Sequence, residues 1–235
     1  MRIQLNKLSI IFSALLLTCG CVFAQTADQV ADFAKAAKFD NVSEVRSLLA
    51  KGINPNSVDA YGNPMLLLAI KDDSNKVIDV LLNDKNIDVD LSNKNGETPL
   101  MIASIQGNLP LVQRLVLKNH ATIDHIAWTP LHYASARGNI SVAEFLISEG
   151  ATVDSRSLND TTPLMMAVQS GNEQLVKLLL DKGADIQLRN SLGFTAIDIA
   201  DIYEKPWIGD GLRSRWLKLY KKPYVRDPKA KLPKS

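Results

Sequence analysis

Cysteine is almost absent from this chain of 235 residues, and its two cysteines lie near the amino terminus. Cys19 and Cys21 fall within the first 24 residues, so residues 25–235 contain no thiol. That long remainder can form no disulfide, no cysteine metal site and no thiolate nucleophile. Its fold must therefore be held together by an apolar core.

Aromatic residues and catalytic motifs are also scarce. Aromatic residues make up 6% of the chain, while leucine, alanine, valine and isoleucine are abundant, which favours helices packed through aliphatic side chains. The sequence has no Gly-x-Ser-x-Gly elbow and no Gly-x-x-x-x-Gly-Lys-Ser/Thr phosphate loop. The adjacent carboxylates Asp72 and Asp73 would point apart on a helix. We therefore expect a protein that is not an enzyme, with no catalytic residues and no cofactor.

Three histidines are present, His120, His125 and His132. Asp124 lies between the first two, which raises the question of a metal site. A stable site needs three or more converging ligands, each oriented by its own hydrogen bonds. Two histidines and one carboxylate on a loop are too few, so we predict no metal ligands.

The first 24 residues have the layout of a secretory signal peptide. A basic start is followed by an uncharged apolar run over residues 8–17 and by small or apolar side chains at 22–24. This order predicts cleavage after Ala24. Two alternatives stay open: an uncleaved anchor over residues 8–24, which is short for spanning a bilayer, and lipidation of Cys21.

Charge is distributed unevenly along the chain. The first 24 residues hold two of the 27 basic residues and none of the 25 acidic ones, so residues 25–235 balance at 25 of each. Residues 204–235 contain ten Lys and Arg against three acids, a net charge of +7. Residues 25–203 contain fifteen against twenty-two, a net charge of −7. The sequence thus has an acidic body and a basic carboxy-terminal end.

A five-fold internal repeat is the strongest signal, because self-similarity at a fixed period determines the architecture. Thr-Pro-Leu or a variant of it begins at residues 63, 98, 129, 162 and 195, so successive copies are 35, 31, 33 and 33 residues apart. A segment containing alanine follows each copy, then a Gly-Asn pair in three of them, and then a second apolar segment. This order predicts a stack of helix pairs.

The pattern resembles the ankyrin repeat over about residues 27–203, as in Thr129-Pro130-Leu131-His132. The resemblance implies an all-α solenoid of helix-turn-helix units with short β-hairpin loops. It also implies that His132 makes structural hydrogen bonds between repeats. Helix physics agrees, because threonine caps helix starts, proline fits the first turn and glycine adopts left-handed helix ends. Each unit can bury its apolar side only by stacking.

These features predict a domain organisation. Residues 1–24 are the signal peptide, 25–56 an amino-terminal capping half-repeat, 57–204 about four and a half ankyrin repeats, 205–220 a divergent carboxy-terminal cap, and 221–235 a flexible basic tail. Lys205-Pro206 should break the helix and residues 209–211 should turn the chain, leaving a final helix over 211–220. The loop between the second and third repeats is about two residues short, which should expose Ile126 and Trp128 differently from their neighbours.

The resemblance also implies where a partner would bind, since ankyrin repeats are usually read at hairpin tips and first-helix ends along a concave face. The partner-binding residues that we predict are Tyr61, Lys71, Glu97, Gln106, Ile126, Trp128, Arg137, Asn159, Phe194 and Tyr203. The remaining equivalent positions are Ile70, Lys94, Asn95, Ile105, Ala136, Leu158, Thr161, Gln169, Ser170 and Leu192. Aromatic residues and arginine dominate interface energetics. The alternative is that Trp128 and Phe194 only cover a neighbouring hairpin.

The sequence therefore predicts an exported, monomeric module that binds another protein through the concave face. A periplasmic inhibitor or immunity protein that neutralises a toxic enzyme is the alternative, and it should bind tightly with salt-sensitive association. A cleaved signal with no mature cysteine favours a bacterial periplasm over a eukaryotic secretory route. Secretion, or a membrane anchor at an uncleaved or lipidated amino terminus, is the alternative. Basic residues with interleaved aromatics can bind single strands, but we expect no nucleic acid partner for an exported protein. Membrane contact is expected only through the basic tail or an uncleaved signal.

Overall fold

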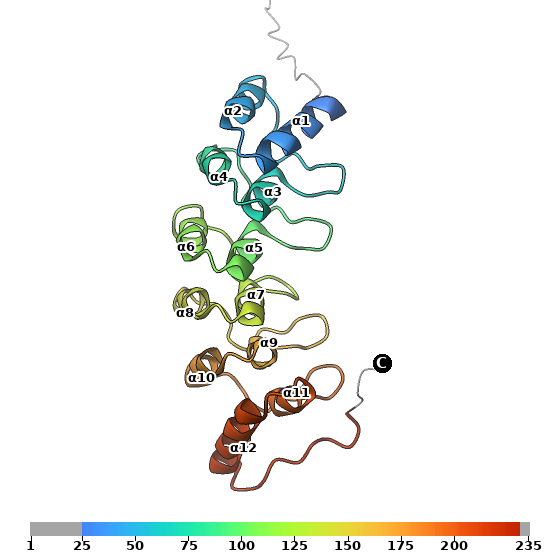
Figure 1. Ribbon diagram of the computed structural model, residues 1–235, viewed down its shortest axis with the longest axis vertical. Coiled ribbons are helices and arrows are strands. Elements are labelled where there is room, and N and C mark those ends of the chain that lie inside the picture. Colours follow the sequence, from blue (N-terminus) through green and yellow to red (C-terminus); the bar gives the residue numbers. More distant parts are fainter. Residues whose placement is uncertain (1–24, 231–235) are drawn as a thin grey trace, which may run out of the picture.

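The computed structural model describes residues 25–230, which contain twelve helices stacked in pairs along one axis (Figure 1). Their bounds are α1 Ala27–Lys38, α2 Val42–Ala50, α3 Met65–Lys71, α4 Asn75–Leu82, α5 Pro99–Gln106, α6 Leu109–Leu117, α7 Pro130–Arg137, α8 Ile140–Ser148, α9 Pro163–Ser170, α10 Glu173–Asp181, α11 Ala196–Ile202 and α12 Pro206–Tyr220. This arrangement confirms the predicted all-α solenoid. The predicted signal peptide lies outside the described residues. Among those residues, no helix is both long enough and apolar enough to span a bilayer.

The first helix of each repeat begins and ends where the sequence predicts. The N-caps of α5, α7, α9 and α11 are threonines, and each side chain accepts a hydrogen bond from the backbone N–H three residues later. Proline takes the next position in α5, α7 and α9. Gly107, Gly138 and Gly171 end those three helices at φ values of 71°, 71° and 79°, in the left-handed region that glycine adopts without strain.

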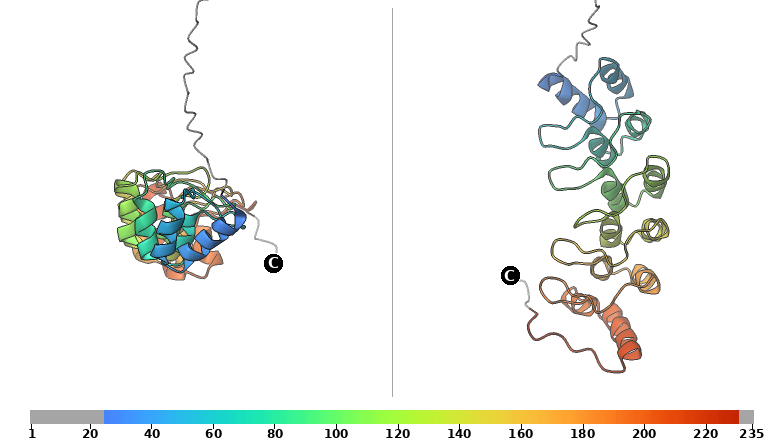
Figure 2. Two further views of the ribbon diagram at one scale, coloured as in Figure 1. Left: turned by 90° about the horizontal axis from the view of Figure 1, so that it is seen from above. Right: turned by 180° about the vertical axis from the view of Figure 1, so that it is seen from behind.

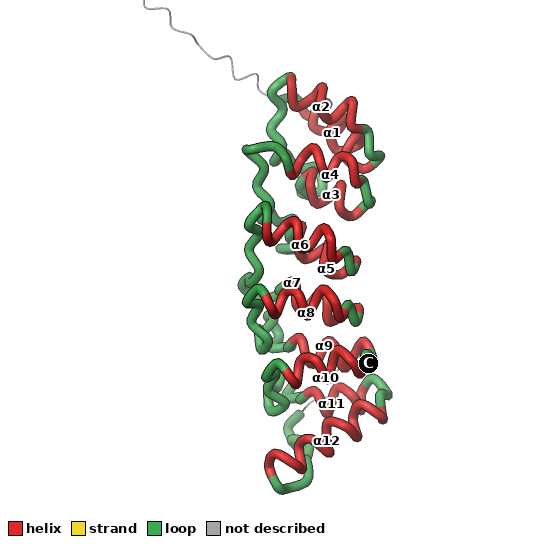
Figure 3. The backbone as a smooth tube through the Cα atoms, turned by 90° about the vertical axis from the view of Figure 1, so that its left-hand side faces the viewer, coloured by secondary structure: helices red, strands yellow, loops and turns green. Residues whose placement is uncertain are grey.

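The core follows the axis of the stack. Successive first helices, from α1 through α11, pack against one another, and most second helices do so in a parallel row (Figure 2). Ala103, Ala134, Ala167 and Ala200 occupy the same position in consecutive repeats and are fully buried. Their small side chains let the paired helices approach closely. Viewed from the side, the longer loops gather along one edge of the helices and the short turns lie at the opposite edge (Figure 3).

The loops between repeats have the course of hairpins but form no β-strand within residues 25–230; a single isolated bridge joins Val58 and Pro64. In four loops, the backbone N–H of residue 59, 93, 157 or 190 donates to the carbonyl four positions later. The side chains of Asp59, Asn93, Ser157 and Asn190 also accept hydrogen bonds from backbone N–H groups of their own loop. Polar side chains thus satisfy backbone groups that a strand partner would otherwise satisfy.

The shortened loop before α7 differs from the other four, as the sequence predicts. Ala127 there has a φ of 77°, in a region that non-glycine residues rarely adopt. The side chain of Ile126 is 97% exposed, whereas Trp128 is partly buried. The shorter loop therefore turns the side chain of Ile126 outward and packs that of Trp128 against the helices.

The prediction for residues 205–211 is wrong in part. Pro206 is the first residue of α12, where its missing N–H costs nothing, and Gly209 and Gly211 lie inside that helix rather than in a turn. Gly209 is buried, and a β-carbon at this position would lie 3.4 Å from the β-carbon of Ala200 in α11. Gly209 therefore serves close packing of two helices, which replaces the expected break.

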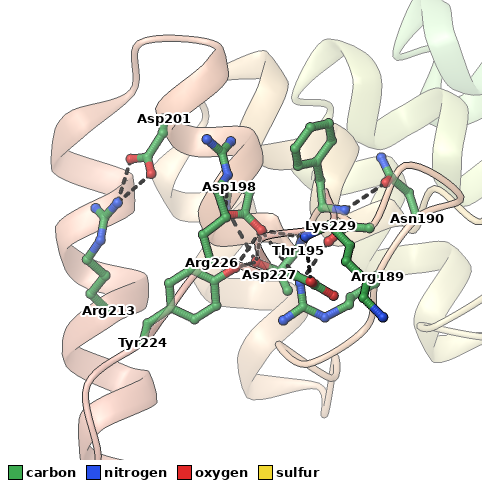
Figure 4. A network of polar contacts seen from close by, with 12 residues as sticks. Arg189, Asn190, Thr195, Asp198, Asp201, Arg213, Tyr224, Arg226, Asp227 and Lys229 are labelled. Carbon is green, nitrogen blue, oxygen red and sulfur yellow. Dashed lines mark hydrogen bonds and ion pairs between the residues drawn. The ribbon is translucent and has the colours of Figure 1, made fainter. Parts of the chain in front are cut away.

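The prediction of a loose tail is wrong for residues 221–230, which return along the last repeat (Figure 4). The hydroxyl of Tyr224 donates to the carboxylate of Asp198 at 2.5 Å, and Arg226 Nε lies 3.1 Å from the other oxygen of that carboxylate. The guanidinium of Arg226 also lies 5.1 Å from the ring centroid of Phe194. We call residues 221–230 the strap, because they fasten α12 back onto α11.

Candidate interaction surface

Trp128 separates two hollows on the face formed by the first helices and the hairpin loops. The first hollow has a volume of about 200 Å³ and is lined by Ile105, Trp128, His132, Tyr133, Ala136 and Met166. The second has a volume of about 240 Å³ and is lined by Trp128, Asn159, Thr161, Met165, Met166, Gln169, Asn190, Leu192, Phe194, Ile199, Ile202 and Tyr203. We call the two together the Trp128 groove, since Trp128 and Met166 line both.

Trp128 is held in place by the side chain four residues later. The rings of Trp128 and His132 meet edge to face with centroids 5.3 Å apart. His132 Nδ1 accepts a hydrogen bond from the N–H of Thr129, and Nε2 donates to the carbonyl of Thr161 in the next repeat at 2.9 Å. These bonds confirm the predicted structural role of His132. They also fix the ring that supports Trp128.

The imidazole of His132 is fully buried, and this burial holds its pKa below the ordinary value of 6.5. The hydrogen bond to Thr161 and the charge of Asp124 act in the opposite direction but do not outweigh burial. His132 is therefore neutral at pH 7. A neutral imidazole accepts at one nitrogen and donates at the other, as the two hydrogen bonds require.

A polar chain borders the amino-terminal side of the groove. Lys71 Nζ lies 3.2 Å from the carboxylate of Glu97, and the hydroxyl of Tyr133 donates to the same carboxylate at 3.4 Å. Burial opposes ionisation of Glu97, but hydrogen bonds from Asn93 and Lys71 outweigh it and hold the pKa of Glu97 below 4.5. Burial and the charge of Glu97 raise the pKa of Tyr133 to about 12. Lys71 and Glu97 largely neutralise each other, which leaves the groove wall uncharged.

The structure brings together only some of the predicted partner-binding residues. Trp128, Asn159 and Tyr203 line the second hollow. Ile126 and Tyr61 project from their loops with 97% and 76% of the residue exposed, and neither lines the groove. Gln106 donates to the carbonyl of Ile70 and so links two repeats.

Two predicted surface positions are wrong. Phe194 is only 1% exposed, because the strap covers it from outside, so it forms part of the floor of the second hollow and not an exposed tip. Ile70 is fully buried in α3. Arg137 is exposed, as expected, and lies at an open depression beside Ser170 and Glu173.

Sequence reasoning missed six residues of the groove: Tyr133, Met165, Met166, Asn190, Ile199 and Ile202. Tyr133 and Met166 each lie four positions after the N-cap threonine of their repeat, and Ile202 lies seven positions after its own. Ile105, which was predicted, occupies that seventh position in its repeat. Aligning all repeats from the threonine would therefore have found Ile202.

The chemistry of the groove suits binding rather than catalysis. Its walls are thioether, aromatic and aliphatic groups, and its polar rim consists of amides and hydroxyls. Asp124 accepts hydrogen bonds from the N–H and hydroxyl of Thr152, which gives it a structural role between loops. Across residues 25–230, no three His, Cys, Asp or Glu side chains converge as metal ligands would.

Comparison with known proteins gives consistent results over most of the chain. A family model described as ankyrin repeats in three copies matches residues 33–127, 85–157 and 107–190. Over 114 residues the chain is 33% identical to Ankyrin repeat and SAM domain-containing protein 6 of Mus musculus, which covers 47% of this chain and 13% of that protein. Over 156 residues it is 30% identical to Ankyrin repeat protein nuc-2 of Neurospora crassa, and this match covers 64% of this chain and 14% of that protein. It is 27% identical over 134 residues to Neurogenic locus notch homolog protein 1 of Homo sapiens, and this match covers 56% of this chain and 5% of that protein. The chain thus spans a small fraction of the length of these relatives.

Proposed function

Because this chain belongs to the ankyrin-repeat family, whose repeats bind other proteins, we propose that it is an exported module that binds a partner protein through the Trp128 groove. The observation that carries the proposal is the position of Trp128 between two apolar hollows, with its ring held by His132. Tryptophan is enriched among the residues that dominate binding energy. A side chain that is already ordered loses little entropy on binding, which favours affinity.

The size of the groove favours a protein partner over a small ligand. Pockets for drug-sized molecules usually have volumes of about 300 Å³ or more. The two hollows are smaller, at about 200 and 240 Å³, and lie on either side of one side chain. Each suits one or two apolar side chains from a protein segment, while Asn159, Gln169 and Asn190 at the rim can bond its backbone. The proposal gives the chain no catalytic role and treats it as a monomer.

Export is supported by the order of charge and hydrophobicity in residues 1–24. Mass spectrometry of the amino terminus of the native protein, together with fractionation of the cell, tests this part. A chain that begins at Gln25 in the periplasmic fraction is the expected result. An intact amino terminus on a cytoplasmic protein would contradict export without affecting the groove.

Quantitative capture of partners tests the groove. Immobilised wild-type protein is compared with a Trp128→Ala/Met166→Ala variant and with Trp207→Ala as the matched control, since Trp207 is 52% exposed on α12 outside the groove. A protein that binds wild type and Trp207→Ala, but binds the groove variant at least about tenfold more weakly, is expected from the loss of an interface hot spot. Equal binding by all three proteins would sink the proposal.

The net charge of −7 on residues 25–203 keeps the inhibitor or immunity function as a second candidate. Complementary charge accelerates association, and salt removes that acceleration. Association rates measured at low and high salt separate the two functions. A strongly salt-dependent, very tight complex with a basic enzyme favours the inhibitor, and a weaker complex with little salt dependence favours a scaffold.

A further inference from the structure

The distal end of α12 combines unpaired lysines with exposed leucines. Figure 1 shows that the last turn of α12 and the loop after it form one extreme of the long axis of the molecule. We call residues 217–222 the tip. Leu217 and Leu219 are 52% and 54% exposed there, and Lys218, Lys221 and Lys222 are exposed beside them.

The basic residues of this end are used in two different ways. Arg213 pairs with Asp201, Arg215 with Asp181 and Arg226 with Asp198, so the arginines hold the end of the stack together. Among the ion pairs of residues 25–230, none involves a lysine of the tip. The positive charge of the tip is therefore available to a partner.

The strap fixes where the tip points. Tyr224 and Arg226 are turned toward Asp198, while Val225 between them is 74% exposed (Figure 4). The backbone on both sides of Lys221 and Lys222 is therefore attached, by α12 before them and by the contacts of Asp198 after them. The lysines and leucines are presented together before any partner arrives.

We infer that the tip docks on a membrane surface that contains anionic lipids. Lysines attract anionic headgroups, and leucines on the same protruding turn can enter the apolar boundary below the headgroups. The net charge of −7 on residues 25–203 opposes binding along the length of the stack. The tip therefore contacts the lipid, and the rest of the stack points away from it. A polyanion such as a nucleic acid would use the lysines but not the leucines. This inference is independent of the Trp128 groove.

Flotation of the full chain with lipid vesicles tests the inference. One set of vesicles contains phosphatidylcholine alone, and the other also contains about 30% phosphatidylglycerol, which supplies anionic charge. The test variant is Lys218→Gln/Lys221→Gln/Lys222→Gln. The matched control is Lys76→Gln/Lys85→Gln/Lys118→Gln, which removes the same charge from exposed positions of the stack. Residues 1–24 are common to every sample, so their contribution cancels in the comparison.

We expect the wild type to prefer anionic vesicles and the test variant to lose about a hundredfold in partitioning, since each lysine near the surface contributes about fivefold. The control variant should lose less than about threefold, because its lysines lie away from the lipid. Equal partitioning of the test and control variants, or no preference of the wild type for anionic vesicles, overturns the inference.

A second variant distinguishes a membrane from a soluble polyanion. Leu217→Ser/Leu219→Ser keeps every lysine and should lower vesicle partitioning by about tenfold through lost apolar burial. Its binding to single-stranded DNA should match that of the wild type. Unfolding in urea is measured for each variant to show that the stack is intact. Lipid docking is overturned if the leucine variant floats with the vesicles as well as the wild type does and the protein also binds the DNA. Those two results together would show a purely electrostatic site.

Discussion

His132 donates a hydrogen bond from Nε2 to the carbonyl oxygen of Thr161, 2.9 Å away in the next repeat. His132 is fully buried and Thr161 is partly buried. Removing the imidazole would break this bond between repeats and leave the carbonyl of Thr161 with only the bond from the backbone N–H of Ser157. The same imidazole supports the ring of Trp128. One side chain thus joins the stability of the stack to the geometry of the proposed binding groove.

The variant His132→Ala should lower the free energy of unfolding by about 2 kcal/mol, because it loses a hydrogen bond between repeats and leaves a cavity in the core. Urea denaturation followed by circular dichroism measures the change. His125→Ala is the control, because the hydrogen bond of His125 to the carbonyl of Thr122 stays within its own loop, and it should change stability by less than about 0.5 kcal/mol. Equal stability of the two variants would show that the contact between repeats contributes little.

Acid should weaken the stack through His132. Its folded pKa lies below the ordinary value of 6.5, so at intermediate pH the unfolded chain binds a proton that the folded chain does not. The stability that the neutral imidazole of His132 contributes is therefore fully present above pH 6.5 and is lost as pH falls toward its folded pKa. Urea denaturation between pH 7.5 and 5, in rough steps of half a unit, should show this loss in the wild type and a smaller one in His132→Gln. Parallel pH dependence in the two proteins would contradict the assignment.

The repeated part of the fold could be predicted because its signals are local. Thr129 caps α7 through a residue three positions away, and Gly138 ends the same helix with its own backbone. The strap could not be predicted in the same way. Tyr224 contacts Asp198 across 26 residues of sequence, and nothing near either residue indicates the pairing. A sequence rich in lysine and proline reads as loose unless the buried carboxylate that it covers is known.

The groove was predictable in position but not in depth. The register of the repeats placed Trp128 and Tyr203 on the face that carries the groove. It could not show that Phe194 is buried, because the residue that covers it, Arg226, comes from beyond the last repeat. Nor could it show that Lys71 and Glu97 pair with each other, since that depends on side-chain reach between repeats. Contacts between segments that are distant in sequence therefore decided which predicted residues line the groove.

The strap should stabilise the last repeat mainly by neutralising Asp198, which is fully buried. Arg226→Met should cost about 2 kcal/mol, less than the loss of a fully buried ion pair, because Arg226 is 41% exposed and Arg189 still lies 3.9 Å from the carboxylate. In an Asp198→Asn background the same substitution should cost less than about 1 kcal/mol, since no buried charge is left unpaired. Urea denaturation of the four proteins measures this coupling.

The control for this cycle is Arg213→Met. Arg213 and its partner Asp201 are both partly exposed at the outside of the stack, so the substitution should cost about 0.5 kcal/mol. Costs for Arg226→Met that are identical with and without Asp198 would show that the arginine acts by packing on Phe194 instead. A cost no larger than that of Arg213→Met would show that the strap contributes little to stability.

Alkaline pH should release the strap through Tyr224. Burial, together with the hydrogen bond to Asp198, raises the pKa of Tyr224 from 10.0 to about 12. Between these two values the unfolded chain has lost a proton that the folded chain keeps, so stability is present below pH 10 and falls as pH rises toward 12. Tyr133 has a pKa of about 12 as well and adds to the fall. Tyr224→Phe should therefore reduce the pH dependence of stability without abolishing it. Unfolding is measured near pH 9 and pH 11, roughly one unit on either side of the tyrosine pKa in the unfolded chain. A variant with the full alkaline dependence of the wild type would mean that Tyr224 is not closed onto Asp198 in solution.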